Sequence, residues 1–103
     1  MTDKVKLTGG LEKTVTWLWL DPETGGRLKV EYYDFSEDAQ RMFGNDIAYT
    51  ITVREMAKLF STVGKDEVSL IPWIVEYFKS YFGIKQWLEE NKIAFDVEIE
   101  SHA

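Results

Sequence analysis

Cysteine is absent from this 103-residue chain, and histidine occurs once, at His102. These two side chains supply most small metal sites and many nucleophile–base pairs, so their scarcity removes the usual starting points for catalysis. The lack of cysteine also excludes a disulfide framework and is compatible with a reducing compartment. We therefore expect a cytoplasmic protein that uses no metal or cofactor, and we assign His102, in a tail beyond the last predicted strand, no role.

Long apolar runs and basic clusters are also missing. No stretch approaches the roughly 20 apolar residues of a membrane helix, and residues 1–4 lack the apolar character of a signal peptide. Twelve basic residues are scattered among 18 acidic ones, and the net charge is −6. Nucleic-acid binding relies on clustered Lys and Arg that neutralise phosphates. We therefore expect neither nucleic acid nor a membrane as a partner.

The chain does have enough apolar material for one core. Apolar residues make up 45% of it and aromatic residues 15%, and the length fits a single domain over 1–103. Residues 1–10, which end in two glycines, are predicted to be a loosely ordered entry to that domain.

A hairpin is predicted near the start of the domain. Residues 13–20 and 27–35 are rich in β-branched and aromatic side chains and flank a turn-forming segment at 21–26. The register has two solutions, because a one-residue slip turns every side chain to the other face. A loop of odd length would place Leu18 and Leu20 on the face of the second strand's apolar residues. We favour a loop of even length, which places on one face Val15, Trp17, Trp19, Leu28, Val30 and Tyr32.

The remaining elements alternate between helix and strand. Apolar periodicity and start signals predict helices over 37–43, 54–63, 69–82 and 84–91 and strands over 46–53 and 93–100. The predicted order is therefore β-β-α-β-α-α-β, in which the short helix over 84–91 continues the one over 69–82 after an interruption at Gly83. This is an α+β fold, a four-stranded and mainly antiparallel sheet packed by three to four helices in two layers.

The helix predicted over 69–82 has an unusually wide apolar surface. Its apolar side chains cover about 200° of the circumference, whereas a surface helix needs roughly 100° to face a core. One interpretation is a central helix that is packed on two sides. The other is an interface helix that presents Trp73, Tyr77 and Tyr81 to a partner, since Trp and Tyr are common contact residues.

Acidic residues could extend such an interface. The predicted strand over 93–100 carries three carboxylates on one face, spaced ~6.7 Å apart, too far to close a metal shell alone. Cross-strand pairing with Arg27 and Lys29 is the simpler role for them. The alternative is a docking patch for a basic partner, for which the candidate binding residues are Trp73, Tyr77, Tyr81, Glu89, Glu90, Asp96, Glu98 and Glu100.

Our leading hypothesis is a protein–protein interaction module that acts as an adaptor, an inhibitor or a homodimer. Its partner would be another protein or a second copy of the chain. A different class stays open, a small-molecule-binding domain or a carboxylate-dependent enzyme with a pocket between sheet and helices. The residues predicted to line that pocket are Trp17, Trp19, Tyr32, Tyr49 and Asp34.

Overall fold

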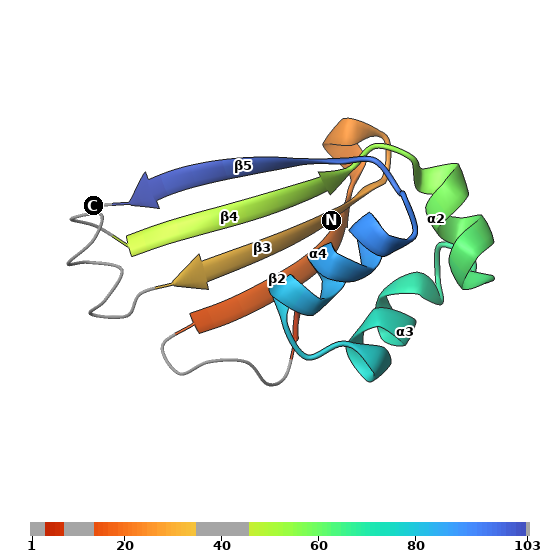
Figure 1. Ribbon diagram of the computed structural model, residues 1–103, viewed down its shortest axis with the longest axis horizontal. Helices are drawn as coiled ribbons and strands as arrows, with labels where there is room; N and C mark the ends of the chain where they lie inside the picture. Colours follow the sequence, from red (N-terminus) through yellow and green to blue (C-terminus); the bar gives the residue numbers. More distant parts are fainter. Residues whose placement is uncertain (1–3, 8–13, 35–45, 103) are drawn as a thin grey trace.

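The computed structural model describes residues 4–7, 14–34 and 46–102. They form one antiparallel sheet with the strand order β1-β2-β3-β4-β5. Three α-helices lie between β4 and β5 in the chain and pack on one face of the sheet, as Figure 1 shows, so the fold is α+β in two layers. The bounds are β1 Val5–Lys6, β2 Thr14–Asp21, β3 Arg27–Asp34, β4 Asp46–Val53, α2 Met56–Val63, α3 Leu70–Tyr77, α4 Tyr81–Glu90 and β5 Phe95–His102.

Among the described residues the sheet has five strands instead of the predicted four. The additional strand β1 lies inside the segment 1–10, which was expected to be loosely held, and it pairs with Leu18 and Trp17 of β2. Leu7 follows β1, and its N–H donates to the carbonyl oxygen of Thr16 at 2.8 Å. Two residues of alternation are too short a signal for a strand, so the pairing with β2 is what reveals it.

Two further predictions concern the segment over 37–43 and the end of the chain at His102. The short helix predicted over 37–43 lies outside the described residues. His102 was expected beyond the last strand, but it is the last residue of β5 and its backbone pairs with Asp46.

The register that we favoured for the β2–β3 hairpin is wrong. Asp21 pairs with Arg27, which leaves an odd loop of five residues between the strands. Because directly opposite residues of an antiparallel pair share a face, the odd loop brings the leucines of β2 to the helix side. The side chains on that face are Thr16, Leu18 and Leu20 of β2 and Leu28, Val30 and Tyr32 of β3.

The loop is odd because it contains a 3-10 turn, Pro22–Thr24. The Asp21 carboxylate accepts the N–H of Glu23 at 3.0 Å and starts this turn. Two glycines with φ of 80° and 88°, Gly25 and Gly26, then return the chain to β3. Left-handed values of φ favour glycine, so the pair of glycines completes a loop that is longer than a two-residue turn.

The core lies between the helices and the face of the sheet that they cover. Leu18, Val30 and Ile51 are fully buried on three adjacent strands. Each buried aliphatic side chain stabilises the fold by roughly 1.5–3 kcal/mol relative to exposure, so this layer holds the helices on the sheet. The buried helix residues that complete it are Leu59, Leu70, Ile74, Tyr81, Ile84 and Leu88.

The helix predicted over 69–82 is two helices. Phe78 is extended, with φ of −124° and ψ of 147°, and ends α3. Ser80 then caps α4, and its Oγ accepts the N–H of Gly83 at 3.2 Å. Gly83 was predicted to interrupt the helix, but it is the third residue of α4. The cap at Ser80 and the extended residue before it place the break earlier in the chain.

Replacing Ser80 with alanine should lower the free energy of unfolding by about 1 kcal/mol, because the N–H of Gly83 loses its acceptor. Ser69→Ala is the matched control, since Ser69 precedes α3, its side chain makes no cap hydrogen bond, and its hydrogen bond with the Asp66 side chain is open to solvent. The control should change stability by less than about 0.5 kcal/mol. Urea denaturation followed by circular dichroism measures both, and equal losses would contradict the capping role of Ser80.

Candidate functional site

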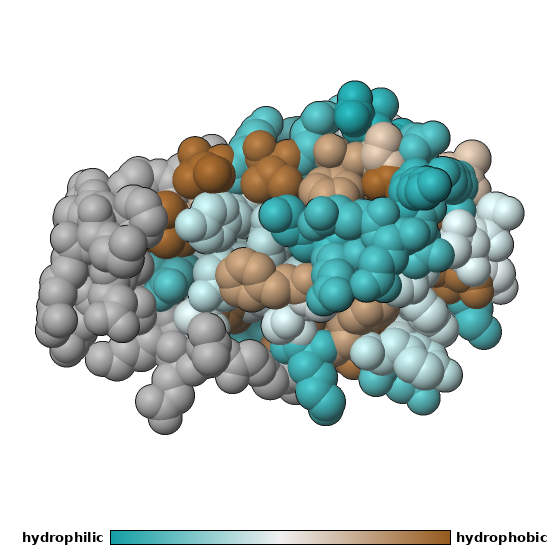
Figure 2. Space-filling view, in the orientation of Figure 1, coloured by the Kyte–Doolittle hydropathy of each residue, from teal (hydrophilic) through white to brown (hydrophobic). Residues whose placement is uncertain are grey.

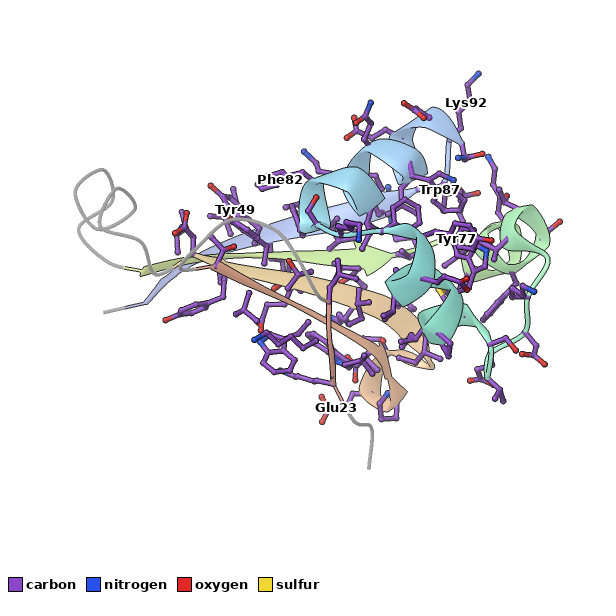
Figure 3. The ribbon with its side chains drawn as sticks, turned by 90° about the horizontal axis from the view of Figure 1, so that it is seen from below. Glu23, Tyr49, Tyr77, Phe82, Trp87 and Lys92 are labelled. Carbon is purple, nitrogen blue, oxygen red and sulfur yellow. The ribbon has the colours of Figure 1, made fainter. Side chains whose placement is uncertain are left out.

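Trp73 and Tyr77, the residues predicted to form an interface on one helix, lie in different environments on α3. Tyr77 is 64% exposed, whereas Trp73 is partly buried against the core. The ring centroid of Trp73 lies 5.2 Å from that of Tyr77 and 5.7 Å from those of Phe78 and Trp87. Trp73 therefore joins α3 to α4, while Tyr77 is left facing solvent (Figure 3).

Tyr81, the third predicted contact residue on that helix, is 2% exposed and belongs to the core. It lies in a cluster with Tyr32, Tyr49 and Phe82. The ring centroid of Tyr32 is 5.9 Å from Tyr49, 5.5 Å from Tyr81 and 4.9 Å from Phe82. The apolar side chains predicted to cover most of one helix are therefore of two kinds. Some, such as Tyr81, are buried in the core, whereas Tyr77 and Phe82 are exposed.

The pocket predicted between sheet and helices is not assembled from the expected residues. Trp17 and Trp19 lie on the face of the sheet opposite to the helices, because Leu18 points toward the core. The Nζ atom of Lys4 lies 4.3 Å from the ring centroid of Trp19 on that face. The two tryptophans are thus separated by the sheet from the tyrosines with which they were grouped.

The other three predicted pocket residues, Tyr32, Tyr49 and Asp34, do come together on the helix side. Burial raises the pKa of Tyr32, and the negative charge of Asp34 and the hydrogen bond between these two side chains add to it. Burial also raises the pKa of Tyr81 to about 12, with a further contribution from the charge of Tyr49. The Tyr32 and Tyr81 hydroxyls are therefore protonated at neutral pH and do not supply a general base.

Asp96 and Glu98 of β5 are exposed on the face of the sheet opposite to the helices. The Oδ1 atom of Asp96 lies 3.4 Å from Nε of Arg54, and these side chains are 59% and 54% exposed. The predicted pairing with Arg27 and Lys29 does not occur, because β4 lies between β3 and β5 in the sheet. An ion pair so open to solvent contributes little stability.

The remaining predicted contact residues lie at two other places. Glu89 and Glu90 are exposed at the end of α4, where Glu90 accepts a hydrogen bond from Gln86 at 3.1 Å. Glu100 pairs through its backbone with Ala48, and its side chain is outside the described set. The residues predicted to bind a partner are thus divided among α3, the end of α4 and β5.

A different group of apolar side chains is exposed beside β5. Phe82 of α4 is 50% exposed, and Val97 and Ile99 of β5 are 38% and 64% exposed. Ile99 lies directly opposite Tyr49 in the sheet, on the helix side. Figure 2 shows apolar side chains along this border of the molecule, and Figure 3 shows Phe82 close to Tyr49. We call these four residues, Tyr49, Phe82, Val97 and Ile99, the α4–β5 surface.

The backbone of β5 adds a second feature to this surface. β5 is eight residues long, and within residues 4–7, 14–34 and 46–102 it pairs with β4 alone. Its other edge therefore presents a row of N–H and C=O groups that no described strand occupies. At the opposite border of the sheet β1 is two residues long, which leaves little edge to extend.

Sequence reasoning missed the α4–β5 surface although it predicted β5 itself. The alternation of the predicted strand placed Val97 and Ile99 on the face opposite to its carboxylates, and the structure places that face on the helix side of the sheet. Their exposure depends on β5 being an edge strand that extends past α4, as Figure 1 shows. The strand order was not predictable from the pattern of one strand.

An open hollow lies beside α3 and has a volume of about 200 Å³. Trp73 is the one aromatic residue that lines it. The hollow is open to solvent, whereas the pockets that hold small ligands are enclosed. The residues that line it are Lys65, Ser69, Pro72, Trp73 and Glu76.

In the part of the chain that the structure describes, no three His, Asp or Glu side chains are grouped as a metal site would require. None of its helices has the length and apolar character needed to cross a membrane. No protein-family model, curated protein or solved structure matches the chain.

Proposed function

We propose that this protein acts by protein–protein contact and that the α4–β5 surface is its contact site. The observation that carries the proposal is the coincidence of three exposed apolar side chains with a long strand edge that no described strand occupies. Exposed apolar groups that lie together, and strand edges that lack a partner, are both features that association with another chain covers.

The aromatic cluster beneath the surface supports this use. The rings of Tyr32 and Tyr81 hold Phe82 at 4.9 Å and 5.2 Å between centroids. A side chain that neighbouring rings already hold in place loses less conformational freedom on binding than a free one. Phe82 is therefore suited to act as an anchor residue.

The small-molecule or enzyme alternative has less support. Its predicted pocket residues are divided between the two faces of the sheet, with Trp17 and Trp19 on one face and the other three on the opposite face. The contact surface, in contrast, needs no chemistry beyond apolar burial and backbone pairing.

Replacing Ile99 with lysine should weaken the binding of the native partner at least tenfold. The partner would cover this side chain, and the complex of the variant would therefore bury a charge in place of an apolar group. Tyr77→Lys is the matched control, since Tyr77 and Ile99 are both 64% exposed. It should change the affinity by less than about threefold.

The partner would be captured from extracts of the native host, purified and titrated against each variant by calorimetry, and circular dichroism would establish that both variants are folded. A partner that the Ile99 variant binds normally and the Tyr77 variant does not would move the contact site to α3. Light scattering on the protein alone measures self-association, which would identify a second copy as the partner.

A further inference from the structure

We infer that β5 receives an extended segment of the partner as a sixth strand, and that this segment alternates apolar with basic side chains. The inference rests on the proposed function and names the chemistry of the partner. It follows from the two different faces of one edge strand.

The length of the β5 backbone suits it to pairing with another strand. An eight-residue strand can pair with an incoming strand over its whole length, and main-chain hydrogen bonds then supply affinity without regard to sequence. Side chains on alternate positions supply the selectivity. At the other border of the sheet, the outermost strand among the described residues is the two-residue β1, which is much shorter.

The side chains of β5 differ between its two faces. On the helix side, Val97 and Ile99 are exposed, and Ile99 lies directly opposite Tyr49 of β4. On the opposite face, Asp96 and Glu98 are exposed, and of the two Asp96 also lies 3.4 Å from Nε of Arg54. A strand that pairs with β5 places successive side chains on alternate faces. It therefore meets apolar groups at every second position and carboxylates at the positions between them.

The charges select against a second copy of this chain. Two β5 strands could pair about a two-fold axis near their middle. With the axis at residue 98, the Glu98 side chains of the two copies would lie opposite each other. With the axis at residue 97, Asp96 of each copy would lie opposite Glu98 of the other. Like charges directly opposite each other destabilise a strand pair. The net charge of −6 on each chain adds long-range repulsion between copies and attraction for a basic partner. Lys or Arg on the incoming strand removes both the repulsion between opposite carboxylates and the long-range repulsion between two acidic chains.

The test uses a synthetic eight-residue peptide in which lysine alternates with valine, capped at both ends and kept at concentrations where light scattering shows it to be monomeric. It should bind the wild-type protein, and the amide resonances that shift in nitrogen–proton spectra should be those of β5. A peptide in which glutamate replaces each lysine should bind at least tenfold more weakly. The lysine–valine peptide with alternate amides methylated along its pairing edge should also lose at least tenfold, because it cannot complete the hydrogen bonds.

Glu98→Lys should reverse the preference, weakening the lysine peptide by about tenfold and strengthening the glutamate peptide by a similar factor. Retained binding of the methylated peptide would overturn the inference, since lysines attracted to carboxylates without backbone pairing would then explain the binding. Failure of the lysine–valine peptide to bind would overturn it too, and the carboxylates would then serve to keep the edge unpaired. A dimer of the wild-type chain through β5 would overturn it in favour of a second copy. None of these three results removes the proposed function, which fails only if Ile99→Lys leaves the native partner's affinity unchanged.

Discussion

Replacing Leu18 with alanine is expected to lower the free energy of unfolding by about 2–5 kcal/mol and to lower Tm by roughly 10 °C or more. Leu18 lies in the middle of β2, is 0% exposed and is directly opposite Val30. Truncation removes apolar contacts and leaves a cavity between the sheet and the helices, which surrounding side chains fill only in part. Urea denaturation followed by tryptophan fluorescence measures the change.

Ile99→Ala is the matched control for this prediction, because it removes the same number of carbon atoms from a side chain that is 64% exposed. It should cost less than about 1 kcal/mol. A small loss for Leu18→Ala would contradict the observed register of the hairpin, since the alternative register places Leu18 on the face without helices.

Raising the pH from 10 to 12 is expected to lower the free energy of unfolding by about 2 kcal/mol through Tyr81. Burial raises the pKa of Tyr81 from its ordinary value of 10.0 to about 12. The unfolded chain releases this proton near pH 10, whereas the folded protein keeps it until about pH 12. Between these values the folded state binds more protons, so stability is complete below pH 10 and is lost as the pH rises.

Tyr81→Phe removes the ionisable hydroxyl and should flatten this part of the stability profile. Some alkaline loss should persist in that variant, because burial also raises the pKa of Tyr32. Tyr77→Phe, at an exposed ring, should follow the wild-type profile. Urea denaturation at intervals of half a pH unit tests the set, and parallel profiles for wild type and Tyr81→Phe would show that Tyr81 is not the group responsible.

Several elements were predictable from local pattern to within about two residues. The strand predicted over 46–53 is β4, and those over 13–20 and 27–35 are β2 and β3 with small changes at their ends. The helix predicted over 54–63 is α2, shortened at its start. Alternation and helical periodicity arise because one face of each element is buried. The apolar residues of that face recur at regular spacing within the segment, so they can be recognised without knowledge of the rest of the chain.

The division of the helix between 69 and 82 shows where such local evidence ends. Ile71, Trp73, Ile74 and Val75 on one side of the break and Tyr81 and Ile84 on the other are all apolar, so periodicity runs through the break. The extended conformation at Phe78 lets α4 turn back across the sheet and bury Tyr81 against Tyr32. That gain in packing comes from residues more than forty positions away, which no local window contains.

By itself, the amino-acid sequence determined the class of the fold, most of its elements and the acidic, apolar alternation of β5. The tertiary structure alone decided the hairpin register, the presence of β1, the edge position of β5 and the exposure of Phe82 and Ile99. The reason is that alternation states which residues share a face, whereas burial depends on which distant strand or helix covers that face. An edge exists only once every other strand has taken its place in the sheet.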